Sequence, residues 1–423
     1  MIKQLIKGLN SSELITDWLI QEITTDSSQA FYVMEKLETR RVVKTTEYHV
    51  TVYKAFSEGE VNYTGSSSFV ISHQISKNDL LKKIEEAAFA ASFVKNKAFE
   101  LISSEKKKSW TQKPFSDDPF ALLDRIASLF FSVSEEHRRF NALETFYNTV
   151  RTHIVSSKGV NYQKTLHKVN VEAIPSFDGP LNKVELYKYY TYVDINEEVI
   201  KNDASSALND VTTRYQAVTL KDLKKADVII KDEDLKDFFH SLIGDYSYDG
   251  IYRQSTDKVI GDSIQKNVTG EYLSMSLIPS SKADAFDRDG VLLSPIKVID
   301  KGVLANYYGS NQYAYYLNMK PSGVMNTLSV QKGKSSYQAM TKKPYIEIIA
   351  LSGIQIEMYS GYIGGEVRLA IFFDGRFHHP VSGFSFSGNI DKSLSQLMMS
   401  KETISIDGYQ GPKYLKLKDM EII

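Results

Sequence analysis

Residues 364–390 read GGEVRLAIFFDGRFHHPVSGFSFSGNI. The stretch EVRLAIFF (366–373) is rich in β-branched and aromatic residues, which favour strands. It meets RFHHPV (376–381) through Asp374-Gly375, a dipeptide typical of two-residue hairpin turns. Glycines at 361, 364, 365, 383 and 388 indicate bulges or close approach of backbones within a sheet. The stretch therefore predicts an antiparallel β domain.

Segments on either side of this hairpin extend the same pattern. PIKVID (295–300), PYIEIIAL (344–351) and IQIEMY (354–359) are short runs with strand composition. One helix precedes them, DEDLKDFFHSLIG (232–244). We expect residues 220–423 to form one β-rich, mainly antiparallel C-terminal domain that contains this helix.

Two smaller α+β units are expected before it, at residues 1–105 and 118–217. Each combines a predicted hairpin with helices, and GEVNYTG (59–65) and KGVNYQK (158–164) occupy equivalent turns, as internal duplication would explain. We predict a helix over 78–102, a linker over 103–119, and a second N-terminal helical stretch after Ser11-Ser12. The fold class is thus α+β: N-terminal α/β units, then a β-rich domain.

The composition excludes several classes of function. The 423 residues include 51 basic and 52 acidic side chains and no cysteine. A net charge near zero supplies no field for nucleic acid, so no direct nucleic-acid partner is expected. The missing thiols exclude disulfides, cysteine nucleophiles and thiolate metal sites. Without a run of about 18 apolar residues or a signal-peptide core, we expect a cytoplasmic protein with no membrane partner.

The helix at 232–244 holds the most informative candidate site. Leu235, Phe238, Phe239, Leu242 and Ile243 recur at helical spacing as one apolar stripe. His240 lies about 140° from Leu235 at 100° per residue, outside that stripe. Asp232 or Asp234 is expected to cap the start, and Gly244 to end the helix with a positive φ.

The hexad His240-Ser-Leu-Ile-Gly-Asp245 resembles a zinc site that lacks several parts. Ser241 cannot serve as the carboxylate general base on a metal-bound water. His240 and Asp245 supply two ligands where catalytic zinc usually has three, and a spacing of five requires a distorted helix. The residues therefore predict no metal ligand and no catalytic residue in this chain, and a partly exposed helix histidine remains the simpler interpretation.

Four segments, taken in order, resemble the TldD/PmbA family, also described as modulators of DNA gyrase. FDRDG (286–290) is similar to the family's F-D-x-E-G segment. Asn326, Gly333 and Ser336 match its N-x-x-x-x-x-G-x-x-S segment, and Pro380-Val381 and Gly388-Asn389 match the end of its hairpin. SSKGV (156–160) is similar to its N-S-x-G turn. The resemblance covers nearly the whole chain.

The resemblance implies a division of labour between two subunits. TldD-type members carry H-E-x-x-x-H and a late cysteine as zinc ligands, and PmbA-type (TldE-type) members lack this set. Ser241 and Asp245 replace two motif residues here, which puts the chain on the PmbA side. The implied function is the metal-free subunit of a heterodimeric cytoplasmic metalloprotease that acts on unfolded or flexible peptides, with zinc in the TldD-type partner.

Two further expectations follow from this resemblance. His240 and Asp245, together with Gly364, Gly365 and Arg368, are expected to lie near the bound peptide, which a strand edge can hold through backbone hydrogen bonds. The alternative is a non-enzymatic homodimer that binds peptides, gyrase or a toxin–antitoxin protein. Whether the chain catalyses anything alone stays open at this point.

Overall fold

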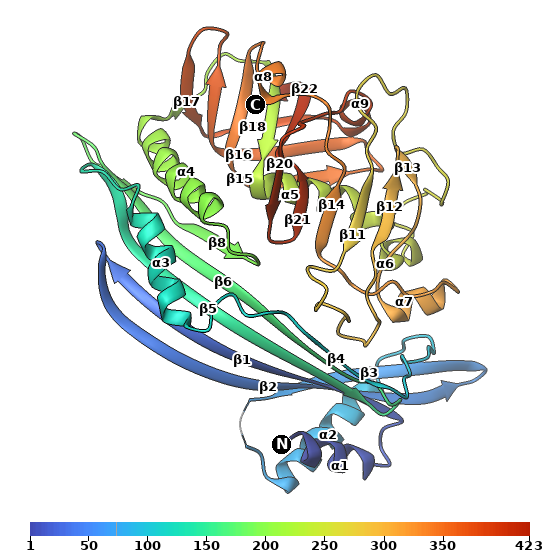
Figure 1. The fold of residues 1–423 in the computed structure, drawn as a ribbon. Coiled ribbons are helices and arrows are strands. Elements are labelled where there is room, and N and C mark those ends of the chain that lie inside the picture. Colours follow the sequence, from blue (N-terminus) through green and yellow to red (C-terminus); the bar gives the residue numbers. More distant parts are fainter. Residues whose placement is uncertain (73) are drawn as a thin grey trace.

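A long, curved sheet forms most of the N-terminal half of the computed structural model, which describes residues 1–72 and 74–423 (Figure 1). In spatial order its strands are β3 (Val61–Ile71), β2 (Lys36–Glu58), β1 (Asp17–Val33), β5 (Arg138–Ser156), β6 (Asn161–Asp178) and β4 (Lys107–Thr111). Two short strands, β7 (Lys183–Glu185) and β8 (Lys188–Tyr192), also pair with β6.

Both expected N-terminal units contribute strands to this one sheet. β1 and β5 pair in antiparallel register from Leu19 opposite Ser156 to Val33 opposite Ala142. In each unit a glycine with positive φ, Gly59 or Gly159, lies in the turn between two long strands. The unit boundaries and the internal duplication stay predictions.

Three local predictions for this half are wrong. The chain after α1 (Ile2–Asn10) forms β1 rather than a second helix, because Trp18 and Ile20 are buried with α1 and α2 in one cluster while Leu19 joins another. The helix expected to reach residue 102 is α2 (Lys77–Ala91). The expected linker contains β4, which pairs in parallel with β6.

Four helices cover the sheet, two near each end. Ile20 of β1 packs in a cluster with α1 and α2, and Ala30 packs in a cluster with α3 (Pro119–Phe131) and α4 (Glu197–Gln216). An even separation puts Ile20 and Ala30 on the same face of the strand. Long strands twist, so this face turns along the sheet, and in Figure 1 α1 and α2 lie below the sheet whereas α4 lies above it.

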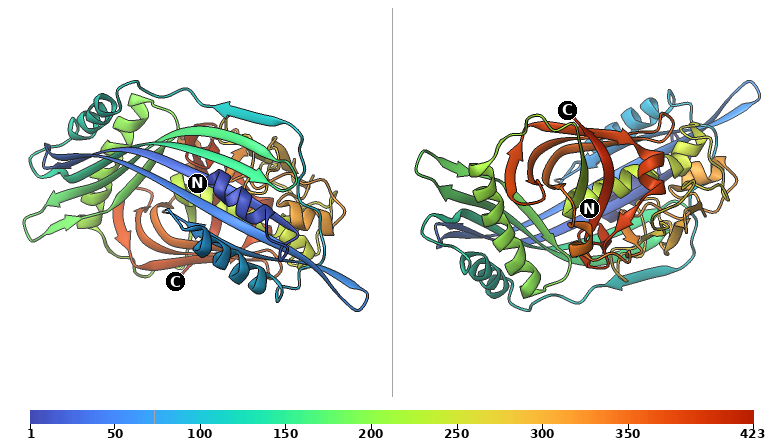
Figure 2. Two further views of the ribbon diagram at one scale, coloured as in Figure 1. Left: turned by 90° about the horizontal axis from the view of Figure 1, so that it is seen from below. Right: turned by 90° about the horizontal axis from the view of Figure 1, so that it is seen from above.

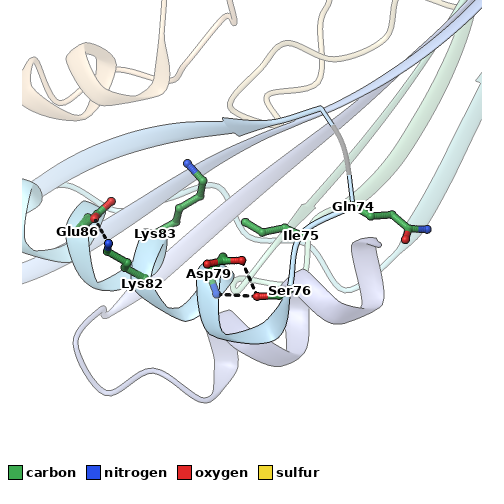
Figure 3. A pocket seen from close by; sticks show the side chains of 7 residues that line it. All are labelled: Gln74, Ile75, Ser76, Asp79, Lys82, Lys83 and Glu86. Atoms are coloured by element: carbon green, nitrogen blue, oxygen red, sulfur yellow. Dashed lines mark hydrogen bonds and ion pairs between the residues drawn. The ribbon is translucent and has the colours of Figure 1, made fainter.

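The start of α2 shows why that helix begins where it does. Ser76, two residues before the predicted start of the helix, is the N-cap: its Oγ accepts from the backbone N–H of Asp79 at 3.1 Å and donates to the Asp79 carboxylate at 2.6 Å. Lys82 and Glu86 form an exposed ion pair one turn later (Figure 3). The residues drawn in Figure 3 line a shallow polar hollow on this part of α2. Because they cap the helix or face solvent, the hollow is an ordinary helix surface.

The C-terminal half is built from two sheets. In the first, β15 (Tyr345–Glu357), β10 (Lys225–Lys231), β22 (Tyr414–Ile422), β18 (Phe384–Asn389) and β16 (Tyr362–Phe373) pair in that order. β16 also pairs with β15, so the five strands close into a ring, whose curvature Figure 2 shows. β17 (His378–Ser382), β9 (Val218–Thr219) and β19 (Met398–Met399) extend it.

The hairpin predicted around Asp374-Gly375 is confirmed, with a longer turn than expected. β16 pairs with β17 from Phe373 opposite His378, so four residues form the connection. The Asp374 carboxylate accepts from the backbone N–H groups of Arg376 and Phe377, both at 2.7 Å. These bonds stabilise the four-residue turn and lower the pKa of Asp374 to about 2, together with His379.

The second C-terminal sheet is smaller. Its strands in order are β13 (Val303–Leu304), β12 (Ile296–Asp300), β11 (Met275–Ile278), β14 (Thr327–Val330), β21 (Tyr409–Pro412) and β20 (Thr403–Ile406). α5 (Asp232–Ile243) packs between this sheet and the ring in the largest hydrophobic cluster. The short helices are α6 (Tyr248–Tyr252), α7 (Asn311–Tyr316), α8 (Tyr337–Met340) and α9 (Ile390–Ser395). The predicted α+β fold with a β-rich C-terminal domain is confirmed.

The two halves meet in two places: α4 contacts β16 and β17 of the ring, and the sheet face opposite the helices contacts the C-terminal domain. Leu19, Tyr53, Ile154 and Tyr162 of the sheet form one buried cluster with Phe286 of the C-terminal domain.

None of the helices in the described ranges has the length and apolarity needed to cross a membrane.

Candidate functional site

The apolar stripe predicted for α5 is confirmed. Its five residues are all buried: Leu235, Phe238, Phe239, Leu242 and Ile243. Phe239 stacks on Tyr409 of the smaller sheet, with ring centroids 6.0 Å apart. This packing fixes the rotation of the helix and turns His240 toward the loops at one end of that sheet.

Both predicted caps of α5 are wrong. β10 ends at Lys231 and the helix begins at Asp232, so no loop residue is left for a capping side chain, and Asp232 itself has a φ of 54°. Gly244 has a φ of −51° and a ψ of −44°, and the chain continues into a 3₁₀ turn, Gly244–Tyr246. Because Gly244 does not interrupt the right-handed path, it does not bring Asp245 back toward His240.

His240 lines a cleft of about 610 Å³ between the two halves of the chain. α5 contributes Lys236 and His240, and β6 of the large sheet contributes Lys164. The remaining walls come from loops of the C-terminal domain: Ser280, Asp284, residues 286–288, Leu293, residues 324–327 and residues 407–408. The size is that of a small-ligand or peptide side-chain site.

Burial lowers the pKa of His240, and the nearby Lys236 charge lowers it further. Backbone groups of Asn326 and Gly408 oppose this shift. A neutral imidazole at neutral pH can donate one hydrogen bond and accept another, which suits a peptide group. The Lys236 Nζ lies 3.5 Å from the Asp407 carbonyl, at the outer wall.

Phe286 and Lys164 hold the floor of the cleft in place. Phe286 is fully buried, and its ring centroid lies 5.8 Å from those of Trp110 and Tyr162. The Lys164 Nζ lies 4.7 Å from the Phe286 ring centroid and donates to the Phe286 carbonyl at 2.6 Å and to Asp284 Oδ1 at 2.7 Å. These contacts tie the C-terminal domain to the sheet.

Asp287 stabilises the turn that follows Phe286. Its Oδ1 accepts from the N–H groups of Asp289 and Val291 at 2.9 Å each, and its Oδ2 accepts from Val324 at 3.0 Å. Burial raises the pKa of Asp287, and these three donors act against the rise. Because both oxygens are engaged, Asp287 has a structural role beneath the cleft.

The residues at this site do not fit a zinc ion. His240 lines the cleft, whereas Ser241 and Asp245 do not. Two of the three aspartates that line the cleft, Asp284 and Asp287, are engaged by Lys164 and by backbone donors. Nowhere in the part of the chain that the structure describes do three His, Asp or Glu side chains gather as a metal site would need. Asp245 is not one of the residues that line the cleft, and burial raises its pKa.

Gly364, Gly365 and Arg368 lie on β16, away from the residues that line this cleft. At the two glycines β16 pairs with β15 on one side and β18 on the other. The Arg368 Nε donates to Ser352 Oγ at 2.7 Å. A peptide contact here would therefore use the face of the ring, and the peptide-binding role of these residues stays a prediction.

Several cleft residues were not singled out as site residues from the sequence. Lys164 and Lys236 belong to no recognisable motif, and no local signal identifies them. Arg288 and Asn326 lie within the segments that carry the family resemblance. Those motifs are therefore the sequence signal that could identify them as cleft residues. Other motif residues have structural roles: Ser336 caps α8, and Asn389 caps α9.

A His240→Gln substitution is expected to reduce the acid sensitivity of the fold. The folded-state pKa of His240 lies below the unfolded value of about 6.5, so the unfolded chain binds the proton first as the pH falls. Stability is full above that value and declines as the pH falls through the folded pKa. Urea unfolding between pH 7.5 and 5 should show a smaller decline in the variant. An unchanged decline, or an equal effect of the exposed His137→Gln, would contradict this role.

A family model matches the C-terminal half. Residues 223–423 match the model described as the PmbA/TldA metallopeptidase C-terminal domain. The matched range contains α5, both C-terminal sheets apart from β9, and every residue of the cleft except Lys164. None of the curated proteins matches the chain.

Three solved structures share the fold over the whole chain. TldE from Thermococcus kodakarensis is 13% identical with a TM-score of 0.76, and the alignment covers 100% of this chain and 99% of that one. A modulator of DNA gyrase from Thermotoga maritima is 13% identical, with full coverage of both chains and a TM-score of 0.73. One from Bacteroides thetaiotaomicron is 14% identical, with 100% and 97% coverage and a TM-score of 0.74.

Proposed function

We propose that this chain, whose residues 223–423 match the PmbA/TldA metallopeptidase C-terminal domain, is the metal-free subunit of a cytoplasmic, two-subunit peptide-cleaving enzyme. In this proposal the His240 cleft binds a flexible peptide, and a TldD-type partner supplies the zinc and the hydrolytic chemistry. The observation that supports it best is a polar cleft at the position of the zinc motif. The side chains that line this cleft are unsuited to bind zinc.

The chemistry of the cleft suits binding rather than bond cleavage. A neutral His240 offers a donor and an acceptor to a peptide group, and Lys236 and Arg288 supply positive charge. Hydrolysis would need an activated water and a free general base. Asp284 and Asp287 hold structural hydrogen bonds, and no metal-binding cluster of His, Asp or Glu accompanies His240 in the described residues to activate a water.

Mixing the chain with the TldD-type protein of the same genome tests the proposal. We expect a heterodimer by size exclusion with light scattering, and at least a tenfold faster cleavage of unfolded casein than with either protein alone. His240→Trp, which fills the cleft, should leave the heterodimer intact and remove most of the gain. His137→Trp, on an exposed loop, serves as the matched control.

The alternative, a non-enzymatic homodimer, predicts different results in the same experiment. A chain that stays a homodimer in the presence of the TldD-type protein and adds nothing to proteolysis would be a non-enzymatic binding protein. Cleavage of casein by the chain alone, abolished in His240→Trp, would instead make it an enzyme in its own right.

A further inference from the structure

A second cavity of about 470 Å³ lies on the other side of the Phe286–Gly290 turn. Arg288 lines both this cavity and the His240 cleft, so the two spaces meet at its side chain. The turn between them is anchored by Phe286 and Asp287 and does not need to move for either space to exist.

Three adjacent strands of the N-terminal sheet form the floor of this second cavity. Leu19 of β1 lies opposite Thr51 of β2, which lies opposite Ser68 of β3, and Gln21 lies opposite His49 in the neighbouring row. Directly opposite residues share a face of the sheet, so these side chains point together into the cavity. Their hydroxyl, amide and imidazole groups can bond the backbone of an extended peptide.

Apolar and aromatic side chains form the walls. Phe99 lies edge-on to the ring of Tyr53, with centroids 6.3 Å apart, and Leu101 and Tyr313 complete the lining. Asn311 fixes this wall, because its Nδ2 donates to the Glu100 carbonyl at 2.7 Å. A polar floor with apolar walls fits a peptide whose backbone lies on the sheet and whose side chains face the walls.

Arg288 is only weakly paired where the two cavities join, with Asp289 of the second cavity as its partner. Its side chain is 76% exposed, and its ion pair within the described chain is long, 3.9 Å from Nε to Asp289 Oδ1. Asp287 cannot turn toward it, because backbone donors hold both carboxylate oxygens. A guanidinium with open donors prefers a carboxylate, which it can bind through two hydrogen bonds.

We propose that the second cavity is a further peptide subsite, continuous with the His240 cleft, and that Arg288 binds the side-chain carboxylate of an aspartate or glutamate in the passing peptide. This inference rests on the proposed function, since it extends the peptide beyond the first cleft. It assigns a sequence preference to a chain whose other predicted contacts are with the peptide backbone.

Two blocked octapeptides of alanine and serine, identical except for glutamate or glutamine at position four, test the role of Arg288. We expect the purified chain to bind the glutamate peptide about tenfold more tightly in low salt, as measured by fluorescence anisotropy. Arg288→Gln should abolish that preference. Arg376→Gln, in the exposed β16–β17 turn, should retain it. Equal binding of the two peptides by the unmodified chain overturns the assignment of Arg288.

Peptide length tests the second cavity itself. A blocked tetrapeptide should bind at least tenfold more weakly than the glutamate octapeptide. Ser68→Trp, which fills the cavity floor, should reduce octapeptide affinity to the tetrapeptide level and leave the tetrapeptide unaffected. Ser57→Trp, on the same face of the sheet but outside the cavity, is the matched control.

The outcomes separate the two proposals. Tetrapeptide binding without any gain on lengthening, or a gain that survives Ser68→Trp, overturns the second subsite alone. No binding of the octapeptide overturns both the subsite and the proposed peptide cleft.

Discussion

Lys231→Met is expected to destabilise the protein by about 3–5 kcal/mol, because it removes one partner of a buried ion pair. The Lys231 Nζ lies 2.9 Å from Glu347 Oε1, and the side chains are 23% and 11% exposed. The Tyr337 hydroxyl donates to the other Glu347 oxygen. Burial alone would lower the pKa of Lys231, but the charges of Glu347 and Asp232 outweigh it and raise the pKa. Urea unfolding at pH 7 measures the loss.

A double substitution distinguishes a lost ion pair from simple loss of packing. Lys231→Met leaves the charge of Glu347 without its partner. Lys231→Met combined with Glu347→Leu should cost less than the single change. Lys225→Met, at the exposed start of the same strand, is the control. A double variant that is as unstable as Lys231→Met would contradict the ion-pair account.

Phe286→Ala is the second large effect, at about 3–5 kcal/mol for removal of a fully buried ring. The loss has a specific location: it leaves a void between the N-terminal sheet and the C-terminal domain, under both cavities. We therefore expect a lower unfolding midpoint together with weaker octapeptide binding. Calorimetry and anisotropy measure the two effects on the same sample.

Phe377→Ala provides the comparison for this substitution. Phe377 is 56% exposed at the β16–β17 turn, so its removal should change the stability by less than about 1 kcal/mol. If Phe286→Ala costs no more than Phe377→Ala, the contact between the halves is not held by this ring.

Local sequence patterns predicted elements better than their assembly. The stripe from Leu235 to Ile243 predicted α5 because helical period is a property of a dozen neighbouring residues. The helix predicted after Ser12 is wrong because one turn of helix and a short strand can share the same apolar content. The pairing of β1 with β5 had no local signal, since its partners lie more than a hundred residues apart in the chain.

The same contrast between local patterns and long-range packing applies to the candidate site. His240 was identified because a histidine off the apolar stripe is visible in the sequence of one helix. Lys164 reaches the cleft from a different sheet, and the packing of Phe286 on Tyr162 and Trp110 brings it there. Gly244 misled the prediction of both the helix end and the position of Asp245, because a glycine permits a positive φ without requiring it.

The shared sheet also constrains how the chain can fold during synthesis. β1 can pair with β2 early in synthesis. The other edge of β1 stays unpaired until β5 leaves the ribosome, more than a hundred residues later. Until then a seventeen-residue strand offers its free amides and carbonyls to any other nascent chain. Self-association of such intermediates should therefore be the main loss during refolding at high protein concentration.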